Sequence, residues 1–301
     1  MKKLIFLFLA VSSLGLHAGT FDEIVTIFQA KCGDCHGGNQ PAAGLVLTGS
    51  ASSIYANIVN VPAQNQWALS KGYKLVEKGF PDRSFLYRKI NNGLYHDSEL
   101  ESTNAGEIMP SGYAPDLTNA EIELVRQWIF HDASQTSTVV SFNPLEQYYA
   151  GNGIEELERP TPPAAGEGFQ LYLGKIFLQP GEEREIIYKY PLLNAEGFEV
   201  TRIETTMDAM SHHLLFFKDR DGSINQNNGF LTVTLLSGNS AITNDTKMIG
   251  GWANDGVLDL PQGTAYTWDA NTILKYNFHL KNYSTTAILG SEVYMNVYTQ
   301  P

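Results

Sequence analysis

The hydrophobic periodicity of this chain of 301 residues changes once along its length, and that change limits which folds it can adopt. From Thr20 to about Ala133, apolar residues recur at helical spacing, as in TFDEIVTIFQAKC and LTNAEIELVRQWIFHDA. From about residue 167 they alternate, as in EREIIYKY and TILKYNFHL, which is typical of strands that bury one face. The sequence therefore predicts a multidomain protein: an all-α domain followed by an all-β sandwich of the jelly-roll kind.

The expected boundaries follow from composition. Residues 1–18, MKKLIFLFLAVSSLGLHA, have two lysines, a short apolar run and then small residues, which is the layout of a secretory signal peptide. The all-α domain would span residues 19–133, and the β domain residues 167–301. Residues 134–166 contain ERPTPPAAGEG and are expected to be a linker.

Charge and hydrophobicity exclude some partners. The chain has 20 basic and 32 acidic residues, a net charge of −12, and losing Lys2 and Lys3 with the signal peptide would make it −14. Nucleic acid and anionic membrane surfaces are poor partners for such a chain. After the signal peptide, no segment approaches the roughly 20 apolar residues of a spanning helix. We therefore expect a periplasmic or secreted protein without a membrane span.

The stretch AKCGDCHGG contains the only two cysteines, Cys32 and Cys35, and His36 follows the second directly. A small disulfide ring or a redox-active CxxC pair would account for the thiols but not for the histidine. The CxxCH pattern attaches a c-type haem, with both sulfurs in thioether bonds and the imidazole bound to the iron. The sequence therefore predicts covalent haem at Cys32 and Cys35, with His36 as the proximal iron ligand.

The distal iron ligand is expected far along the chain. Met109 lies in the turn-rich stretch GEIMPSGYAP, and a thioether ligand there would make a Met/His site with a raised reduction potential. His96, in GLYHDSE, is the competing candidate. His131, at the end of the last helical pattern, is interpreted instead as a positive charge at a helix C-terminus.

Several of these pieces occur together in one known family. CGDCH, PDRSFLYRKI, IMPSG and LTNAEIELVRQWI follow one another over residues 20–133, and this region resembles a class I c-type cytochrome domain. The resemblance implies an all-α cytochrome c fold and says nothing about the redox partner.

Three histidines of the second half suggest a metal site. His212 and His213 are adjacent in MSHHLLFFK, and His279 lies in TILKYNFHL. Strand alternation places His279 on the face opposite Tyr276 and Phe278, away from the sandwich core. The same alternation would point His212 and His213 to opposite faces, so both reach one ion only if a bulge or the strand's end intervenes. The residues alone leave a three-histidine metal site and scattered surface histidines both open.

A second resemblance favours the metal site. SHHLLFF, GGWANDG, LPQGTAYTW and KYNFHL are similar, in order and spacing, to the first copper-binding β domain of the peptidylglycine and dopamine monooxygenase family. The resemblance implies a type 2 copper bound by His212, His213 and His279. The histidine pair of that family's second copper domain has no counterpart here. Met295 is interpreted first as a residue of the hydrophobic core and second as a weak candidate for an axial ligand of the copper. Met207 and Met210 are interpreted in the same way.

Together these features predict an exported c-type cytochrome that transfers electrons to or from a mononuclear type 2 copper site. The enzymatic version is copper-dependent monooxygenation of a small-molecule substrate. The expected partner is therefore either such a small-molecule substrate or another redox protein. An alternative is a cytochrome electron carrier whose β domain is a non-catalytic copper-binding or partner-docking module. Zinc hydrolysis ranks last, because no glutamate stands at helical spacing beside the histidines.

Overall fold

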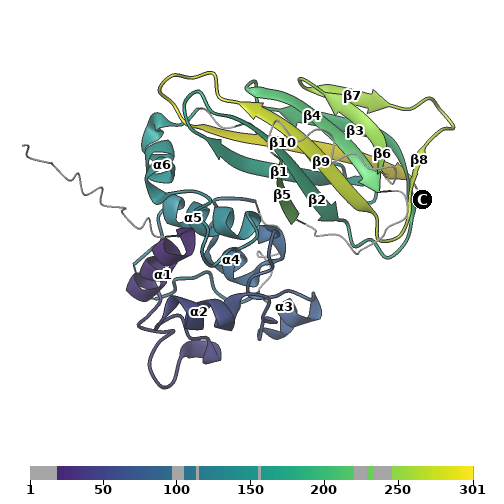
Figure 1. Cartoon of the computed structure of the whole chain (residues 1–301). Helices are drawn as coiled ribbons and strands as arrows, with labels where there is room; N and C mark the ends of the chain where they lie inside the picture. The colour runs from purple at the N-terminus through teal and green to yellow at the C-terminus, as the bar shows by residue number, and fades with distance from the viewer. Residues whose placement is uncertain are drawn as a thin grey trace, which may run out of the picture.

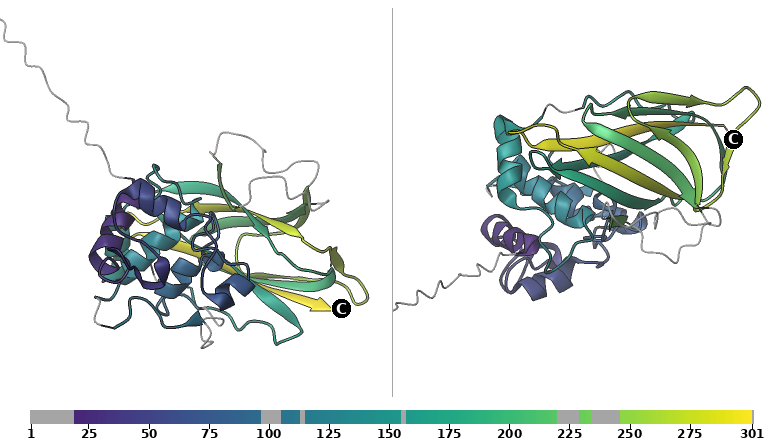
Figure 2. Two further views of the ribbon diagram at one scale, coloured as in Figure 1. Left: turned by 90° about the horizontal axis from the view of Figure 1, so that it is seen from below. Right: turned by 45° about the horizontal axis from the view of Figure 1, so that its top comes forward.

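The computed structural model describes residues 19–96, 105–112, 115–154, 157–219, 229–233 and 246–300. The expected signal peptide, residues 1–18, lies outside these ranges. Short helices gather at one end of a larger β-sandwich, as Figure 1 and the two views of Figure 2 show. Within the described ranges, no helix combines the length and the apolar character needed to cross a membrane.

The helical region is built around two helices whose apolar stripes face each other. Phe21 of the first stacks on Trp128 of the second, with ring centroids 4.8 Å apart, and both side chains are fully buried. The helices of this region are α1 (Thr20–Lys31), α2 (Ala51–Ile58), α3 (Gln66–Ser70), α4 (Phe85–Ile90) and α5 (Asn119–Phe130), with short 3-10 helices at Ala42–Gly44 and Pro81–Arg83.

In the sequence, Thr20 with Glu23 and Thr118 with Glu121 match the capping-box pattern, which predicts such a cap at the start of each helix. The two predictions had different outcomes. At α5 the prediction is confirmed: Glu121 N–H donates to Thr118 Oγ1 at 3.3 Å, and Thr118 N–H donates to Glu121 Oε2 at 2.7 Å. At α1 the prediction is wrong, because the N-cap is Gly19 and Asp22 accepts from its N–H. The Thr20 hydroxyl donates to Val140 O at 2.8 Å instead, which ties the helix start to a later segment.

The prediction of an all-α cytochrome c domain over residues 19–133 is wrong, and so is the family resemblance that implied it. In the described part of the chain there are six short α-helices of 5 to 12 residues, about a quarter of it is helical, and more of it is strand than helix. Helical periodicity and capping are local signals, and they are strongest at α1 and α5. Between these helices the glycine- and proline-containing stretch GGNQPAAG and the isolated bridges Val59–Val76 and Lys74–Ser84 replace helix with irregular backbone.

The expected linker also contains ordered structure. Helix α6 (Phe142–Gln147) and a π-helical turn at Tyr148–Asn152 lie within residues 134–166. Leu145 and Tyr148 from these turns are buried in the core of the helical region. This part of the chain is therefore packed against both the helical region and the β-sandwich.

The β-sandwich consists, in the residues described, of two five-stranded antiparallel sheets. One has the order β1-β10-β3-β7, with β8 also paired to β3, and the other has the order β5-β2-β9-β4-β6. The strands are β1 (Gly168–Leu178), β2 (Glu183–Pro191), β3 (Phe198–Met207), β4 (Ser211–Asp219), β5 (Gly229–Val233), β6 (Thr246–Trp252), β7 (Gly256–Asp259), β8 (Tyr266–Trp268), β9 (Ile273–Lys281) and β10 (Leu289–Gln300).

The two parts of the molecule share their cores. Phe80 and Phe130, from the helical region, belong to the apolar core of the sandwich, where Phe130 lies 5.0 Å from the ring of Tyr188. In return, Phe177 and Ile288 of the β region belong to the helical core. Their relative position is therefore fixed by packing on both sides.

Arg126 of α5 is the polar anchor of this junction. Its side chain contacts β1 at the point where the pairing of β1 with β10 shifts in register, between Leu173 and Ile176. Its guanidinium donates to Gly174 O and, at 2.5 Å, to Lys175 O, while Nε donates to Glu123 Oε1 at 2.8 Å. Gly174 has a φ of 143°, and an added Cβ would lie 2.5 Å from Glu292 Cβ, so only glycine fits there.

We expect Arg126→Leu to lower the free energy of unfolding by roughly 3–5 kcal/mol, because it leaves Glu123 buried without its charged partner. Urea denaturation followed by circular dichroism measures this loss. The matched control is Arg202→Leu, whose partner is Glu204 on the surface and whose side chain is 43% exposed. Loss of an exposed pair should cost about 0–1 kcal/mol. Equal losses in the two variants would show that the junction does not depend on Arg126.

Candidate functional site

The first candidate site follows helix α1 directly. The chain turns at Cys32–His36, where His36 N–H donates to Cys32 O at 2.8 Å. This turn opens onto a cavity of about 570 Å³, within the range of roughly 300–1,000 Å³ typical of cofactor sites. Apolar side chains from distant parts of the helical region line it with the three motif residues, among them Phe28, Leu45, Leu47, Leu86, Ile90 and Met109.

The two thiols do not form a disulfide, and Cys35 is exposed while Cys32 is half-buried. Burial, with the nearby Glu121 carboxylate, raises the pKa of the Cys32 thiol to about 11. A redox-active CxxC pair needs the opposite shift, because its thiolate is the reactive form. The surroundings therefore disfavour a catalytic dithiol at this position.

The environment of His36 leaves one ring nitrogen available. Its Nδ1 lies 3.3 Å from Leu45 O, a backbone carbonyl that can only accept a hydrogen bond. With Nδ1–H donating to that carbonyl, Nε2 carries the free lone pair that a metal requires. This is how an iron-binding imidazole is commonly oriented by its own protein.

The structure brings Met109, and not His96, to the CxxCH turn. Met109 lines the same cavity as Cys32, Cys35 and His36, and its N–H donates to Lys89 O of α4 at 2.7 Å. His96 is exposed and lines a different cavity. The interpretation of His131 as a positive charge on the helix dipole is wrong, because desolvation lowers its pKa to about 3 and the ring is neutral at pH 7.

The second candidate site is the histidine cluster on the sheet β5-β2-β9-β4-β6. Ser211 pairs with Leu280 and His213 pairs with His279, so His212 is the extra residue of a bulge in β4. The bulge is the break in alternation that both histidines need to reach one ion. Asp208 holds the start of β4 in place, because its carboxylate accepts from Ser211 Oγ at 2.8 Å.

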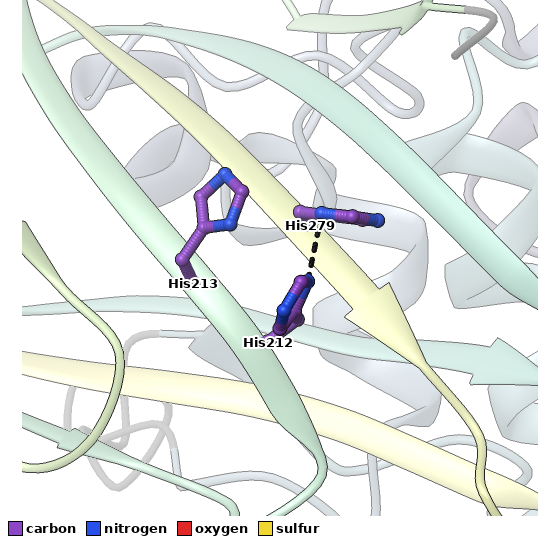
Figure 3. Close-up of side chains that lie close together, drawn as sticks. All are labelled: His212, His213 and His279. Atoms are coloured by element: carbon purple, nitrogen blue, oxygen red, sulfur yellow. Dashed lines mark hydrogen bonds between the residues drawn. The ribbon is translucent and has the colours of Figure 1, made fainter.

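The three imidazoles meet on neighbouring strands β4 and β9 (Figure 3). His212 Nδ1 lies 3.1 Å from His279 Nδ1, and one ligand nitrogen from each ring can be chosen so that all lie within 4.8 Å of one another. Tetrahedral coordination at about 2.0–2.1 Å requires nitrogen–nitrogen distances near 3.4 Å, so ring rotations would close the remaining gap. This is the only group of three or more potential ligands of its kind within the described residues.

The lowered pKa of His213 favours metal binding at this cluster. Desolvation, together with the His279 and His212 rings, lowers the pKa of His213 below its ordinary value of 6.5. A histidine must be neutral to bind a metal, so a lowered pKa reduces competition from protons near pH 7. The donor set of three imidazoles suits copper, zinc, iron or nickel.

Glu183 adjoins the cluster through His279, and no pattern in the sequence predicted this contact. Its Oε1 lies 2.8 Å from His279 Nε2, and its Oε2 lies 3.1 Å from Lys281 Nζ. Hydrogen bonds from Lys281 and His279 lower the pKa of this carboxyl, so it is ionised. A carboxylate that accepts from one ring nitrogen directs the other to a metal. Here that other nitrogen is His279 Nδ1, which faces His212.

The methionines of the β region lie elsewhere. Met295 and Met207 are buried in the sandwich core, at 1% and 5% exposure, as the core-packing interpretation requires. Met210 is partly buried against the same core.

Comparisons with known proteins add no family. No family model matches the chain, and no curated protein matches its sequence. The resemblance to the copper monooxygenase family is therefore withdrawn together with the cytochrome resemblance. The two candidate sites rest on their own residues and geometry.

We expect Glu183→Ala to weaken metal binding roughly 10- to 100-fold, because His279 loses the group that orients its ring. Competition with a chelator of known affinity measures the dissociation constant for Cu²⁺ and Zn²⁺. Glu182→Ala is the matched control: it removes the same charge one residue away, where the side chain contacts Arg184 instead. Unchanged affinity in Glu183→Ala, or an equal loss in the control, would contradict this role.

Proposed function

We propose that this chain is an exported electron-transfer protein with two redox sites. A haem attached covalently to Cys32 and Cys35 exchanges electrons with a mononuclear copper ion at His212, His213 and His279. Export is inferred from residues 1–18. The partner is another redox protein or a small-molecule substrate, and not nucleic acid, given the net charge of −12.

One observation carries the haem half of the proposal. Two attachment thiols, a histidine and a methionine from distant segments line a single cavity with largely apolar walls. Such a set fits a porphyrin with one imidazole and one thioether ligand. Haem bound there would supply one-electron transfer at a potential raised by the thioether.

The residues around the cavity have separate roles in this proposal. Leu45 O fixes the His36 ring through Nδ1. Lys89 O holds the backbone of Met109, and the short helix α4 thereby sets the position of the thioether. Leu47 and Leu86, which are nearly fully buried, exclude water from the cavity walls. None of these roles requires the helical region to be an all-α cytochrome domain.

The copper half is supported by the histidine cluster and its bulge. Three neutral imidazoles leave at least one coordination position open for water or a small ligand. A copper ion held there would supply a second one-electron centre. Copper-dependent monooxygenation of a small substrate is the enzymatic form of this proposal.

A second candidate function is favoured by one observation. Within the described ranges there is no second cluster of three or more potential metal ligands, so a second metal centre to assist oxygen chemistry is not found there. The β region could then hold copper in one oxidation state, or dock a partner, while electrons pass only through the helical region.

The haem half is tested by Met109→Ala. In oxidised wild-type protein, methionine ligation to haem iron gives a weak absorption band at the red end of the spectrum, and this variant should lose it. Met248→Ala is the control, since that side chain is 52% exposed on β6. An unchanged spectrum in Met109→Ala would contradict the assignment and move the ligand to His96.

A further inference from the structure

A second large cavity lies at the junction of the two parts and belongs to neither candidate site. It has a volume of about 510 Å³ and is lined by residues of the helical region and of strands β1, β2 and β9. Helix α4 lies between the two cavities: Leu86 and Ile90 line the CxxCH cavity, whereas Tyr87 and Arg88 line the junction cavity. The views of Figure 2 show this junction at the end of the sandwich.

The walls of the junction cavity are mainly aromatic. Tyrosines come from both parts of the molecule, and Phe130 of α5 lies among them. Aromatic rings pack well on other aromatic rings in offset or edge-to-face arrangements. The aromatic walls include Tyr73, Phe130, Tyr172, Tyr188, Tyr190 and Tyr276.

Several donors of the cavity lining are already used within the protein, since Arg126, Asn91 and Gln170 donate to the backbone carbonyls of Gly174, Tyr95 and Pro160. The hydroxyl of Tyr172 donates to Glu292 at 2.9 Å, that of Tyr188 to Gly79 O at 3.0 Å, and that of Tyr190 to Asp82 at 2.9 Å. A tyrosine oxygen that has donated its proton still accepts. These walls therefore favour a ligand that brings its own O–H group.

His96 is a further lining side chain, and it can accept a hydrogen bond. It is exposed, and its ring makes no hydrogen bond to any residue in the described part of the chain. A neutral imidazole has one nitrogen that accepts a proton from a hydroxyl. This histidine therefore offers the cavity a hydrogen-bond acceptor that no residue of the described ranges occupies.

We propose that the junction cavity binds a planar aromatic molecule bearing a hydroxyl group, that is, a phenol. Its ring packs among the tyrosines, and its hydroxyl donates to His96. This binding goes beyond the proposed electron transfer and requires neither haem nor copper. If the protein proved to bind no haem or no copper, the proposal of phenol binding would stand. If it proved not to bind phenol, the proposed electron transfer would stand.

The test is a calorimetric titration of the full protein with phenol, compared with cyclohexanol, which has a similar size and the same hydroxyl but no π-face. Phenol should bind saturably at one site and roughly tenfold more tightly than cyclohexanol, because several ring contacts are lost in the latter. Equal binding of the two, or no saturable binding of phenol, would overturn the proposal. A change in the haem absorption spectrum on saturation would place phenol in the other cavity and overturn it too.

Variants locate the ligand. His96→Ala should weaken phenol binding roughly 5- to 10-fold, the effect of one lost hydrogen bond, and an exposed residue can be replaced without loss of fold. Tyr190→Leu should weaken it while Tyr190→Phe retains the ring contact. Tyr283→Leu is the control, because this tyrosine is 59% exposed and does not line the cavity. Unchanged affinity in His96→Ala, or the same loss in Tyr283→Leu, would contradict the assignment.

Discussion

The guanidinium of Arg126 joins the two parts of the molecule, because its N–H groups bind Glu123 on its own helix and two carbonyls in the bulge of β1. The side chains of Arg126 and Glu123 are at most 5% exposed, so water compensates neither charge. Gln127 adds a hydrogen bond to Lys175 O at 2.6 Å. The helical region with its CxxCH turn is thereby held in one orientation against the sandwich, whose other sheet bears the histidines. A fixed junction of this kind also fixes the separation of the two candidate sites.

The histidine cluster depends on irregular strand pairing in the same way as the junction does. Without the bulge at His212, the side chains of His212 and His213 would point to opposite faces of β4. The bulge and the pairing of His213 with His279 place three rings together, and the pairing of β2 with β9 brings Glu183 to the outer nitrogen of His279. Irregular backbone at sheet positions of this kind is common near functional groups.

Local signals in the sequence predicted local features well. The Thr118–Glu121 capping box and the core face of β9, with Leu274, Tyr276, Phe278 and Leu280, were both correct because each depends on neighbouring residues alone. The predictions of an all-α domain, of a Thr20–Glu23 capping box and of a charged His131 were wrong, because distant contacts decided each of them. The side chains of Thr20 and Glu23 form hydrogen bonds with segment 139–142. Desolvation and the positive charges of nearby arginines lower the pKa of His131, so that its ring is neutral. Glu183 was missed because strand pairing, not spacing along the chain, brings it to the cluster.

Electron exchange between the two sites is the central claim, and flash photoreduction of the haem tests it most directly. A light-driven donor delivers one electron to the haem under anaerobic conditions, and its reoxidation is followed by absorption in copper-loaded and zinc-loaded protein. With copper, reoxidation should be first-order, at a rate independent of protein concentration, whereas with zinc the haem should stay reduced. The same decay in both forms, or a rate proportional to protein concentration, would contradict electron transfer within one molecule.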